Sequence, residues 1–233
     1  MAKLLQLSAS EWQALHLSLR VALYSVAFSL PVAVGIAWLL TRRRFPGRTL
    51  FDAVVHLPLV LPPVVIGYLL LLLFGVHGPL GAWLNQQFGV RLAFTSAGAA
   101  LATATMSFPL MVRAMRIALE NVDRGLEEAA RTLGAGPVDR FLTITLPLMA
   151  PGVLAGTITA FSAGLGEFGA VITFVGNVPG ETQTLPIALY SALQTPDGDA
   201  RAAHLALISF VLGLAGLLVA ELVARAMRRR LGR

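Results

Sequence analysis

Five long stretches without Asp, Glu, Lys or Arg constrain this chain more than any other feature. They cover residues 21–41, 53–90, 92–112, 141–166 and 202–220. A helix needs about 20 mainly apolar residues to cross the hydrocarbon core of a bilayer. Each stretch can hold one such helix, and the second has room for an additional loop. Only 13% of all residues are charged, about half the fraction in soluble domains. We therefore predict a single all-α integral membrane domain over 1–233, with spans near 18–40, 53–75, 93–115, 146–167 and 202–224.

The arrangement of Lys and Arg predicts how these helices are oriented. Most of the 18 basic residues fall in three clusters, at 42–48, 113–140 and 225–233. With five spans, all three clusters lie on one side of the membrane, and only Lys3, Arg20, Arg91 and Arg201 lie on the other. Because cytoplasmic loops are enriched in Lys and Arg, the clusters should be cytoplasmic and the N-terminus outside. The net charge of +6 is thus a sign of orientation, and no nucleic-acid binding is predicted.

Two shorter apolar pieces, 168–180 and 182–196, are interrupted by Gly, Pro and Asn. Both are too short for a span. We expect them to form an outer loop with a short interfacial or re-entrant helix near 184–194.

The polar loop at about 120–146 has the features of a short, capped helix. Asp123 is suited to accept backbone N–H bonds at its start, and Glu127 and Glu128 lie in its early turns, where the helix dipole favours negative charge. Gly134 suits a left-handed residue after its end, and Pro137 prevents continuation.

One face of this predicted helix is narrow and apolar. It consists of Leu126, Ala129, Ala130 and Leu133, which are spaced as neighbours on a helix. Two alanines let this face approach another surface closely. The face could dock on a second protein, or it could rest on the chain itself or on lipid headgroups.

Two segments within the spans are candidates for a translocation path or a gate. Pro62 and Pro63, followed by Gly67, interrupt the second span, where each proline removes a helical hydrogen bond. The resulting kink could be static packing, a hinge or a pore lining. At the end of the fourth span stand Gly166, Glu167, Phe168 and Gly169. Glu167 would repel an anion, so bonding to backbone N–H groups of the next turn is its favoured role; Phe168 could be a gate or packing.

The spans contain almost no ionisable residues, which secondary carriers generally need. A phosphate-binding loop of the form Gly-x-x-x-x-Gly-Lys-Ser/Thr is also absent from the sequence. The chain should therefore be non-catalytic and depend on a separate ATPase. It has no cysteine, and its four histidines are scattered, so no metal site or cofactor is predicted.

The loop resembles the Glu-Ala-Ala loop of permease subunits in binding-protein-dependent ABC importers. The matching positions are Glu128, Ala129, Ala130, Gly134, Ile144, Leu146 and Pro147. The resemblance implies the type I ABC importer permease fold. It also implies that the loop carries a cytoplasmic coupling helix, which docks into a cleft on the ATPase through residues including Glu128, Ala129, Ala130, Leu133 and Gly134.

Other segments are similar to the molybdate permeases of that family. They are 45–47, 56–67, 107–113, 129–136 and 166–177. This resemblance implies a multi-pass subunit of the prokaryotic cytoplasmic (inner) membrane, present as a homodimer with two ATP-binding subunits. The further partner would be a periplasmic or extracellular molybdate-binding protein. Sulfate, thiosulfate and tungstate remain alternative substrates, and a standalone anion carrier or a membrane scaffold are alternative functions.

Overall fold

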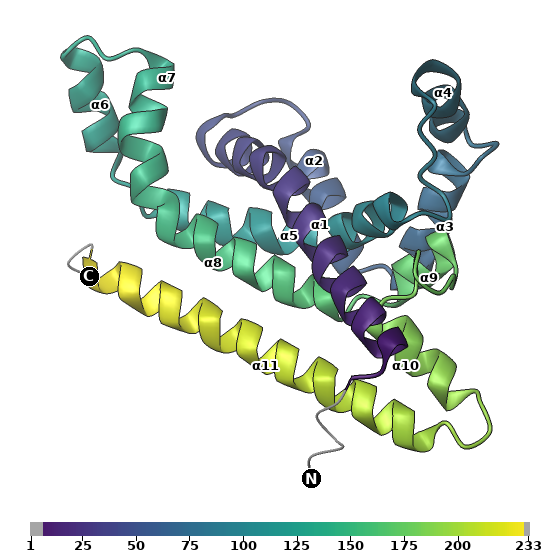
Figure 1. Cartoon of the computed structure of the whole chain (residues 1–233). Helices are drawn as coiled ribbons and strands as arrows, with labels where there is room; N and C mark the ends of the chain where they lie inside the picture. Colours follow the sequence, from purple (N-terminus) through teal and green to yellow (C-terminus); the bar gives the residue numbers. More distant parts are fainter. Residues whose placement is uncertain (1–6, 231–233) are drawn as a thin grey trace.

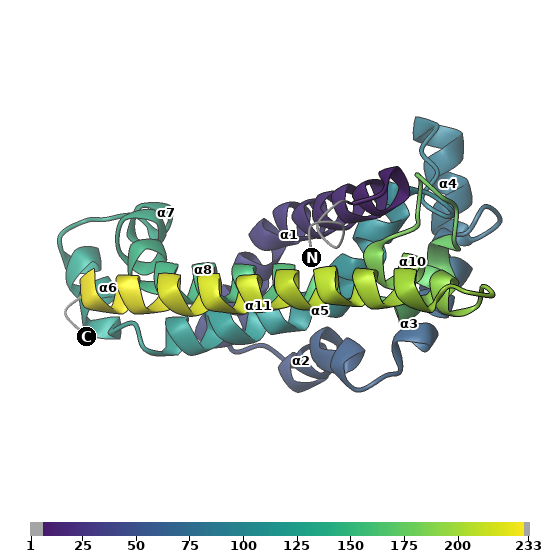
Figure 2. The ribbon, with the colours of Figure 1, turned by 60° about the horizontal axis from the view of Figure 1, so that its bottom comes forward.

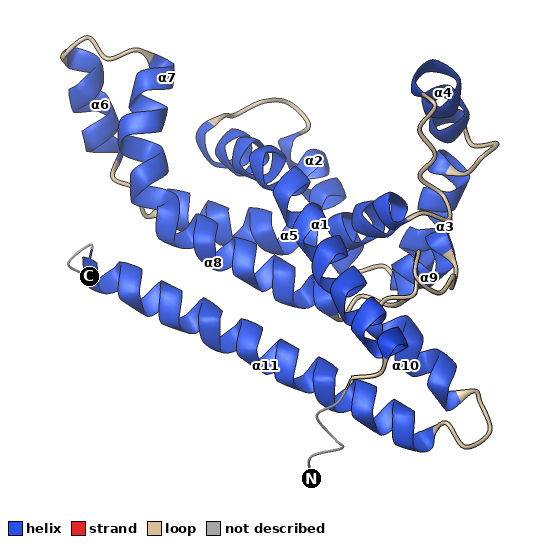
Figure 3. Cartoon of the chain, in the orientation of Figure 1, coloured by secondary structure: helices blue, strands red, loops and turns tan. Residues whose placement is uncertain are grey.

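A computed structural model describes residues 7–230, and every regular element in that range is helical (Figures 1 and 3). α1 (Ala9–Arg42) begins at a capping box in which Ser8 and Glu11 bond each other's backbone N–H groups. α8 (Leu146–Leu165) follows α7 (Pro137–Arg140) and a π-helical turn, Phe141–Thr145. The last long helix is α11 (Asp199–Arg230).

Within residues 7–230, three helical segments are long and apolar enough to cross a membrane: Ala9–Arg42, Pro137–Leu165 and Asp199–Val223. They correspond to the first, fourth and fifth predicted spans, apart from one or two residues at the ends of the last two. The third predicted span lies in α5 (Ser96–Glu120), which starts at the Thr95 cap and is rich in small and hydroxyl-bearing residues. Those residues make α5 less apolar than the other three.

The second predicted span, 53–75, is not one kinked helix. It consists of α2 (Arg48–His56), a 3-10 turn (Leu57–Leu59) and α3 (Pro63–Phe74), and its two arms differ in direction by 112°. The physical reason is the proline pair. Pro62 takes an extended conformation, and Pro63 occupies the start of α3, where a missing N–H costs nothing.

Residues 168–180 also correct an expectation, because part of this predicted loop is helical. α9 (Gly169–Val175) is short, but Ala170, Val171, Phe174 and Val175 are all buried. The short helix expected near 184–194 is confirmed as α10 (Leu185–Leu193). A further helix, α4 (Pro79–Phe88), occupies the extra length after the second span.

The core is formed where α1, α5 and α8 pack on one another. α11 lies along α8 (Figures 1 and 2). α6 (Arg124–Thr132) and α7 stand at one end of the molecule, near the C-terminal end of α11, whereas α3, α4 and α9 lie at the other (Figure 1). The two candidate functional regions are therefore far apart.

Candidate functional site

The polar loop folds as the sequence predicts. Asp123 Oδ1 accepts a hydrogen bond of 2.8 Å from the Gly125 N–H at the start of α6. After the helix, Gly134 has a φ of +90°, which glycine adopts at little cost. The Ala135 N–H donates to the carbonyl of Ala130 at 3.0 Å and so satisfies one of the last free carbonyls of the helix.

The apolar face of α6 is uncovered. The exposed fraction is 48% for Leu126 and 88% for Leu133, and Ala129 is also exposed, with Ala130 half-buried. No residue of α6 is buried. Within the described chain this face therefore does not rest on its own protein, and it is open to another surface.

The flank of α6 beside its apolar face is tied to the rest of the chain through Glu127. Its Oε1 atom accepts a 2.7 Å hydrogen bond from the Thr145 hydroxyl and pairs with Arg42 Nη2 at 3.2 Å. Arg140 also donates to the Glu127 carbonyl at 3.4 Å. These contacts join α6 to the end of α1 and to the start of the α8 span.

Sequence reasoning missed this role of Glu127. Glu127 and Glu128 are adjacent acidic residues, and nothing in their pattern says which one faces inward. In the structure Glu128 is exposed. Helical spacing gives no signal either, because Glu127 lies three residues before Ala130, and Glu128 is farther from the apolar face than Glu127.

The structure brings the two candidate path segments together. α3 packs against α9, and two glycines permit the close approach. A Cβ atom on Gly67 would lie 2.6 Å from the Ala170 carbonyl oxygen, and one on Gly169 would lie 2.8 Å from Pro63 Cβ. Pro63 and Gly67 therefore lie against the segment that contains Gly169. Pro62, which precedes them, is exposed.

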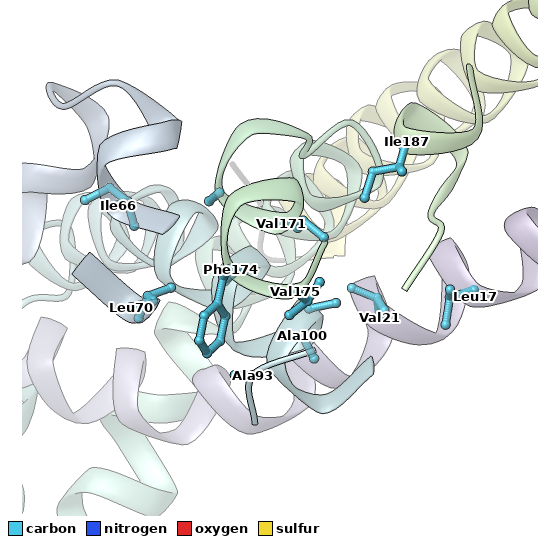
Figure 4. Close-up of a cluster of buried hydrophobic side chains, with 13 residues drawn as sticks. Leu17, Val21, Ile66, Leu70, Ala93, Ala100, Val171, Phe174, Val175 and Ile187 are labelled. Atoms are coloured by element: carbon cyan, nitrogen blue, oxygen red, sulfur yellow. The ribbon is translucent and has the colours of Figure 1, made fainter. Parts of the chain in front are cut away.

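Apolar side chains fill the interior beside this junction. Ile66 and Leu70 of α3 lie with Val171, Phe174 and Val175 of α9 in one buried cluster (Figure 4). Phe174 is fully buried. The junction is thus held by close packing within the chain itself.

Glu167 and Phe168 connect α8 to α9. Glu167 Oε1 accepts a 2.9 Å hydrogen bond from the Ala170 N–H, which is the backbone contact that the sequence favoured. Phe168 packs on Tyr190 of α10 with 5.1 Å between ring centroids. Gly166, in the αR region, is exposed. The Glu167 carboxylate thus caps α9, and the Phe168 ring links α9 to α10.

A family model described as a binding-protein-dependent transport system inner membrane component matches residues 29–229. The chain belongs to this family. It is 57% identical over 227 residues to the molybdenum transport system permease protein ModB of Escherichia coli strain K12, covering 97% of this chain and 99% of that protein. The Haemophilus influenzae protein of the same name is 52% identical, covering 95% of this chain and 97% of that protein.

The more distant similarities include a sulfate permease and solved structures of other ABC importers. The sulfate transport system permease protein CysT of Escherichia coli strain K12 is 39% identical, covering 84% of this chain and 73% of that protein. A bacterial ABC transporter for the import of alginate has a chain with a TM-score of 0.73 at 18% identity, covering 100% of this chain and 83% of that chain. The fold is therefore that of ABC importer permeases.

Proposed function

We propose that this chain is the membrane-spanning permease subunit of an ATP-driven ABC importer that carries molybdate across the cytoplasmic membrane. The observation that carries this proposal is the 57% identity to a molybdenum permease over almost the whole of both chains. The sulfate permease of Escherichia coli strain K12 is more distant than the molybdenum permease of that strain, at 39% identity over a smaller share of each chain.

The proposed topology has five crossings, with the N-terminus outside and the α6 loop in the cytoplasm. α2 and α3 together make the second, broken crossing. This arrangement is supported by the pairing of Arg42, at the end of α1, with Glu127 of α6, since it places two basic clusters at the same end of the molecule. Single cysteines at Ser10 and Asp197 should react with an impermeant thiol reagent from outside intact cells, and one at Gly136 should not. Labelling at Gly136 would contradict the orientation.

The proposed coupling element is α6. Its exposed face, with Leu126, Ala129 and Leu133, would enter a cleft on the ATPase, while Glu127 passes the movement to α1 and α8. Glu128, Ala130 and Gly134 complete the contact region. The permease itself performs no hydrolysis; two copies of it would work with two ATP-binding subunits and an external molybdate-binding protein.

The proposed path or gate lies at the junction of α3 and α9. Pro62, Pro63 and Gly67 form one side, and the segment from Gly166 to Gly169 forms the other. The bend at the proline pair directs α3 onto α9, so a shift of either arm would change this junction. Glu167 acts here by holding the first turn of α9 rather than by contacting the anion.

Substrate is tested best in the assembled importer. Reconstituted importer should hydrolyse ATP faster with binding protein loaded with molybdate than with empty binding protein. Equal or stronger stimulation by sulfate-loaded protein would assign the importer to sulfate, and tungstate is compared in the same way. Anion uptake by the permease without any ATPase subunit would contradict the importer function and favour a secondary carrier.

A further inference from the structure

A basic cavity lies between the coupling helix α6 and the end of α1. Its volume is about 430 Å³, within the usual range for ligand pockets. Five arginines line it, against two glutamates; the arginines are Arg42, Arg43, Arg124, Arg131 and Arg140. One of the glutamates, Glu127, is already paired with Arg42. The cavity therefore carries an excess of positive charge.

The Arg42 side chain, which lines the cavity, is only partly neutralised by its partners. Its side chain is only 9% exposed. One terminal nitrogen, Nη2, reaches Glu127 at 3.2 Å and the Val122 carbonyl at 3.4 Å. The Nε atom, in contrast, is buried and has no hydrogen-bond partner. A buried donor without an acceptor is costly, and a negative charge in the adjacent cavity would stabilise the Arg42 guanidinium group electrostatically.

The positive charge of Arg124 does not stabilise the helix in which it lies. It is the first residue of α6, at the end where the helix dipole disfavours a cation. Its side chain is exposed and lines the cavity. The position makes sense if the guanidinium group binds an anion there.

The surroundings indicate which oxyanion fits. Trp38 lies one turn before Arg42 on α1, also lines the cavity, and has the Arg43 guanidinium 5.4 Å from its ring centroid. Tryptophan and arginine together at the end of a spanning helix are typical of the headgroup region. Basic pockets beside such helices on the cytoplasmic side bind anionic lipid headgroups. The apolar face of α6, which we assign to the ATPase, points away from this cavity.

We propose that this cavity binds the phosphate group of an anionic phospholipid such as phosphatidylglycerol. The phosphate oxygens accept hydrogen bonds from the exposed guanidinium groups of Arg43 and Arg124, beside the charge of Arg42. The lipid thereby joins the end of α1 to the coupling helix, in parallel with the Arg42–Glu127 pair. This site goes beyond the import function and is independent of which anion is carried.

The fluorescence of Trp38 can test the site in the full chain. The protein has three tryptophans, and replacing Trp12→Phe and Trp83→Phe leaves Trp38 as the only reporter. The chain is reconstituted in phosphatidylcholine with a rising fraction of brominated phosphatidylglycerol or brominated phosphatidylcholine. Brominated phosphatidylglycerol should quench Trp38 at a several-fold lower mole fraction. Equal quenching by the two lipids would overturn the proposal.

Two variants test whether the preference for phosphatidylglycerol arises from this cavity. Arg43→Gln and Arg124→Gln should each reduce the preference for phosphatidylglycerol roughly fivefold, the value of about 1 kcal/mol per basic residue. Arg43 packs over the Trp38 ring, so its replacement could alter the fluorescence directly. Arg124 makes no such ring contact with Trp38, and Arg124→Gln therefore controls for that direct effect. The matched control is Arg44→Gln, an exposed neighbour outside the cavity, which should leave the preference unchanged. An equal loss in the control would reduce the effect to general surface charge.

Two further outcomes would reassign the cavity. If millimolar inorganic phosphate abolished the preference, the cavity would be a site for free oxyanions instead of lipid. If Arg43→Gln released the ATPase subunit from the importer while the lipid preference stayed intact, the cavity would belong to the ATPase contact. We expect neither result, and both measurements are independent of transport.

Discussion

The α6 helix and the junction of α3 with α9 are stabilised in opposite ways. α6 has no buried residue, and its link to the chain is polar, through Glu127 with Arg42 and Thr145. The junction instead depends on close backbone approach at Gly67 and on fully buried side chains such as Phe174. The comparison shows that α6 leaves an apolar face open to another surface, whereas the junction is packed within the chain and is sensitive to added volume.

The largest effect is expected from adding a side chain at the junction. In Gly67→Val the Cβ atom would lie 2.6 Å from the Ala170 oxygen and 2.8 Å from Thr173 Cβ. Overpacking of this kind costs about 1–3 kcal/mol, here at the upper end because backbone is involved. Thermal unfolding in detergent should show a clear loss. The control Gly35→Val adds its side chain where no atom lies within 4 Å. Equal melting of the two variants would contradict the close packing.

A smaller loss is expected when α6 is detached from the chain. Glu127→Ala removes the partner of the nearly buried Arg42 and the acceptor of Thr145. Loss of hydrogen bonds to a charged group costs about 2 kcal/mol. Hydrogen exchange should accelerate in α6, while the exposed neighbour changed in Glu128→Ala should keep α6 protected in the isolated subunit. The opposite ranking would reverse our assignment of the two glutamates.

Glu167 tests whether the junction needs its polar cap. In Glu167→Ala the Ala170 N–H loses its acceptor, at a cost of about 1–2 kcal/mol. Glu167→Gln keeps an oxygen in place and should retain more stability and more transport. The readouts are the yield of assembled importer and ATPase stimulation. Normal assembly of Glu167→Ala with an altered anion preference would instead make Glu167 a selectivity residue.

The smallest effect on stability is expected at Gly134. Its φ of +90° strains any residue with a side chain, but no atom lies within 4 Å of an added Cβ. Gly134→Ala should therefore cost only about 1 kcal/mol, confined to the end of α6. Hydrogen exchange of the last turn of α6 should rise while global unfolding stays nearly unchanged. A global loss as large as that of Gly67→Val would show that the loop is packed more tightly than its geometry indicates.

Local sequence rules predicted α6 well because the ends of this helix depend on nearby residues. Asp123 and Gly134 act within a few positions of themselves, so their roles can be read from the sequence. The short helix α10 was also predicted, although Pro186 was counted among the residues that interrupt this segment; in the structure it lies in the first turn of α10. The family resemblance added the expected partner, which no local rule supplies.

Tertiary contacts explain what the sequence did not predict. α9 was expected to be a loop because it is short and flanked by glycines, yet its packing on Gly67 and its Glu167 cap make it a helix. The size of the bend at the proline pair, 112°, similarly depends on a tertiary contact, the packing of α3 against α9. The pairing of Glu127 with Arg42 joins residues 85 positions apart, a distance across which periodicity carries no information.

The central claim is that the exposed face of α6 binds the ATPase. The most direct test is whether a permease altered only on this face still retains the ATPase. Ala129→Trp adds a large ring to an exposed position, so the variant should fold and insert as the parent does. A matched tryptophan in α2, Leu50→Trp, replaces a side chain that is 70% exposed. We expect the ATPase to co-purify with the parent and with Leu50→Trp but not with Ala129→Trp. Normal retention and normal stimulated hydrolysis in Ala129→Trp would show that α6 is not the coupling element.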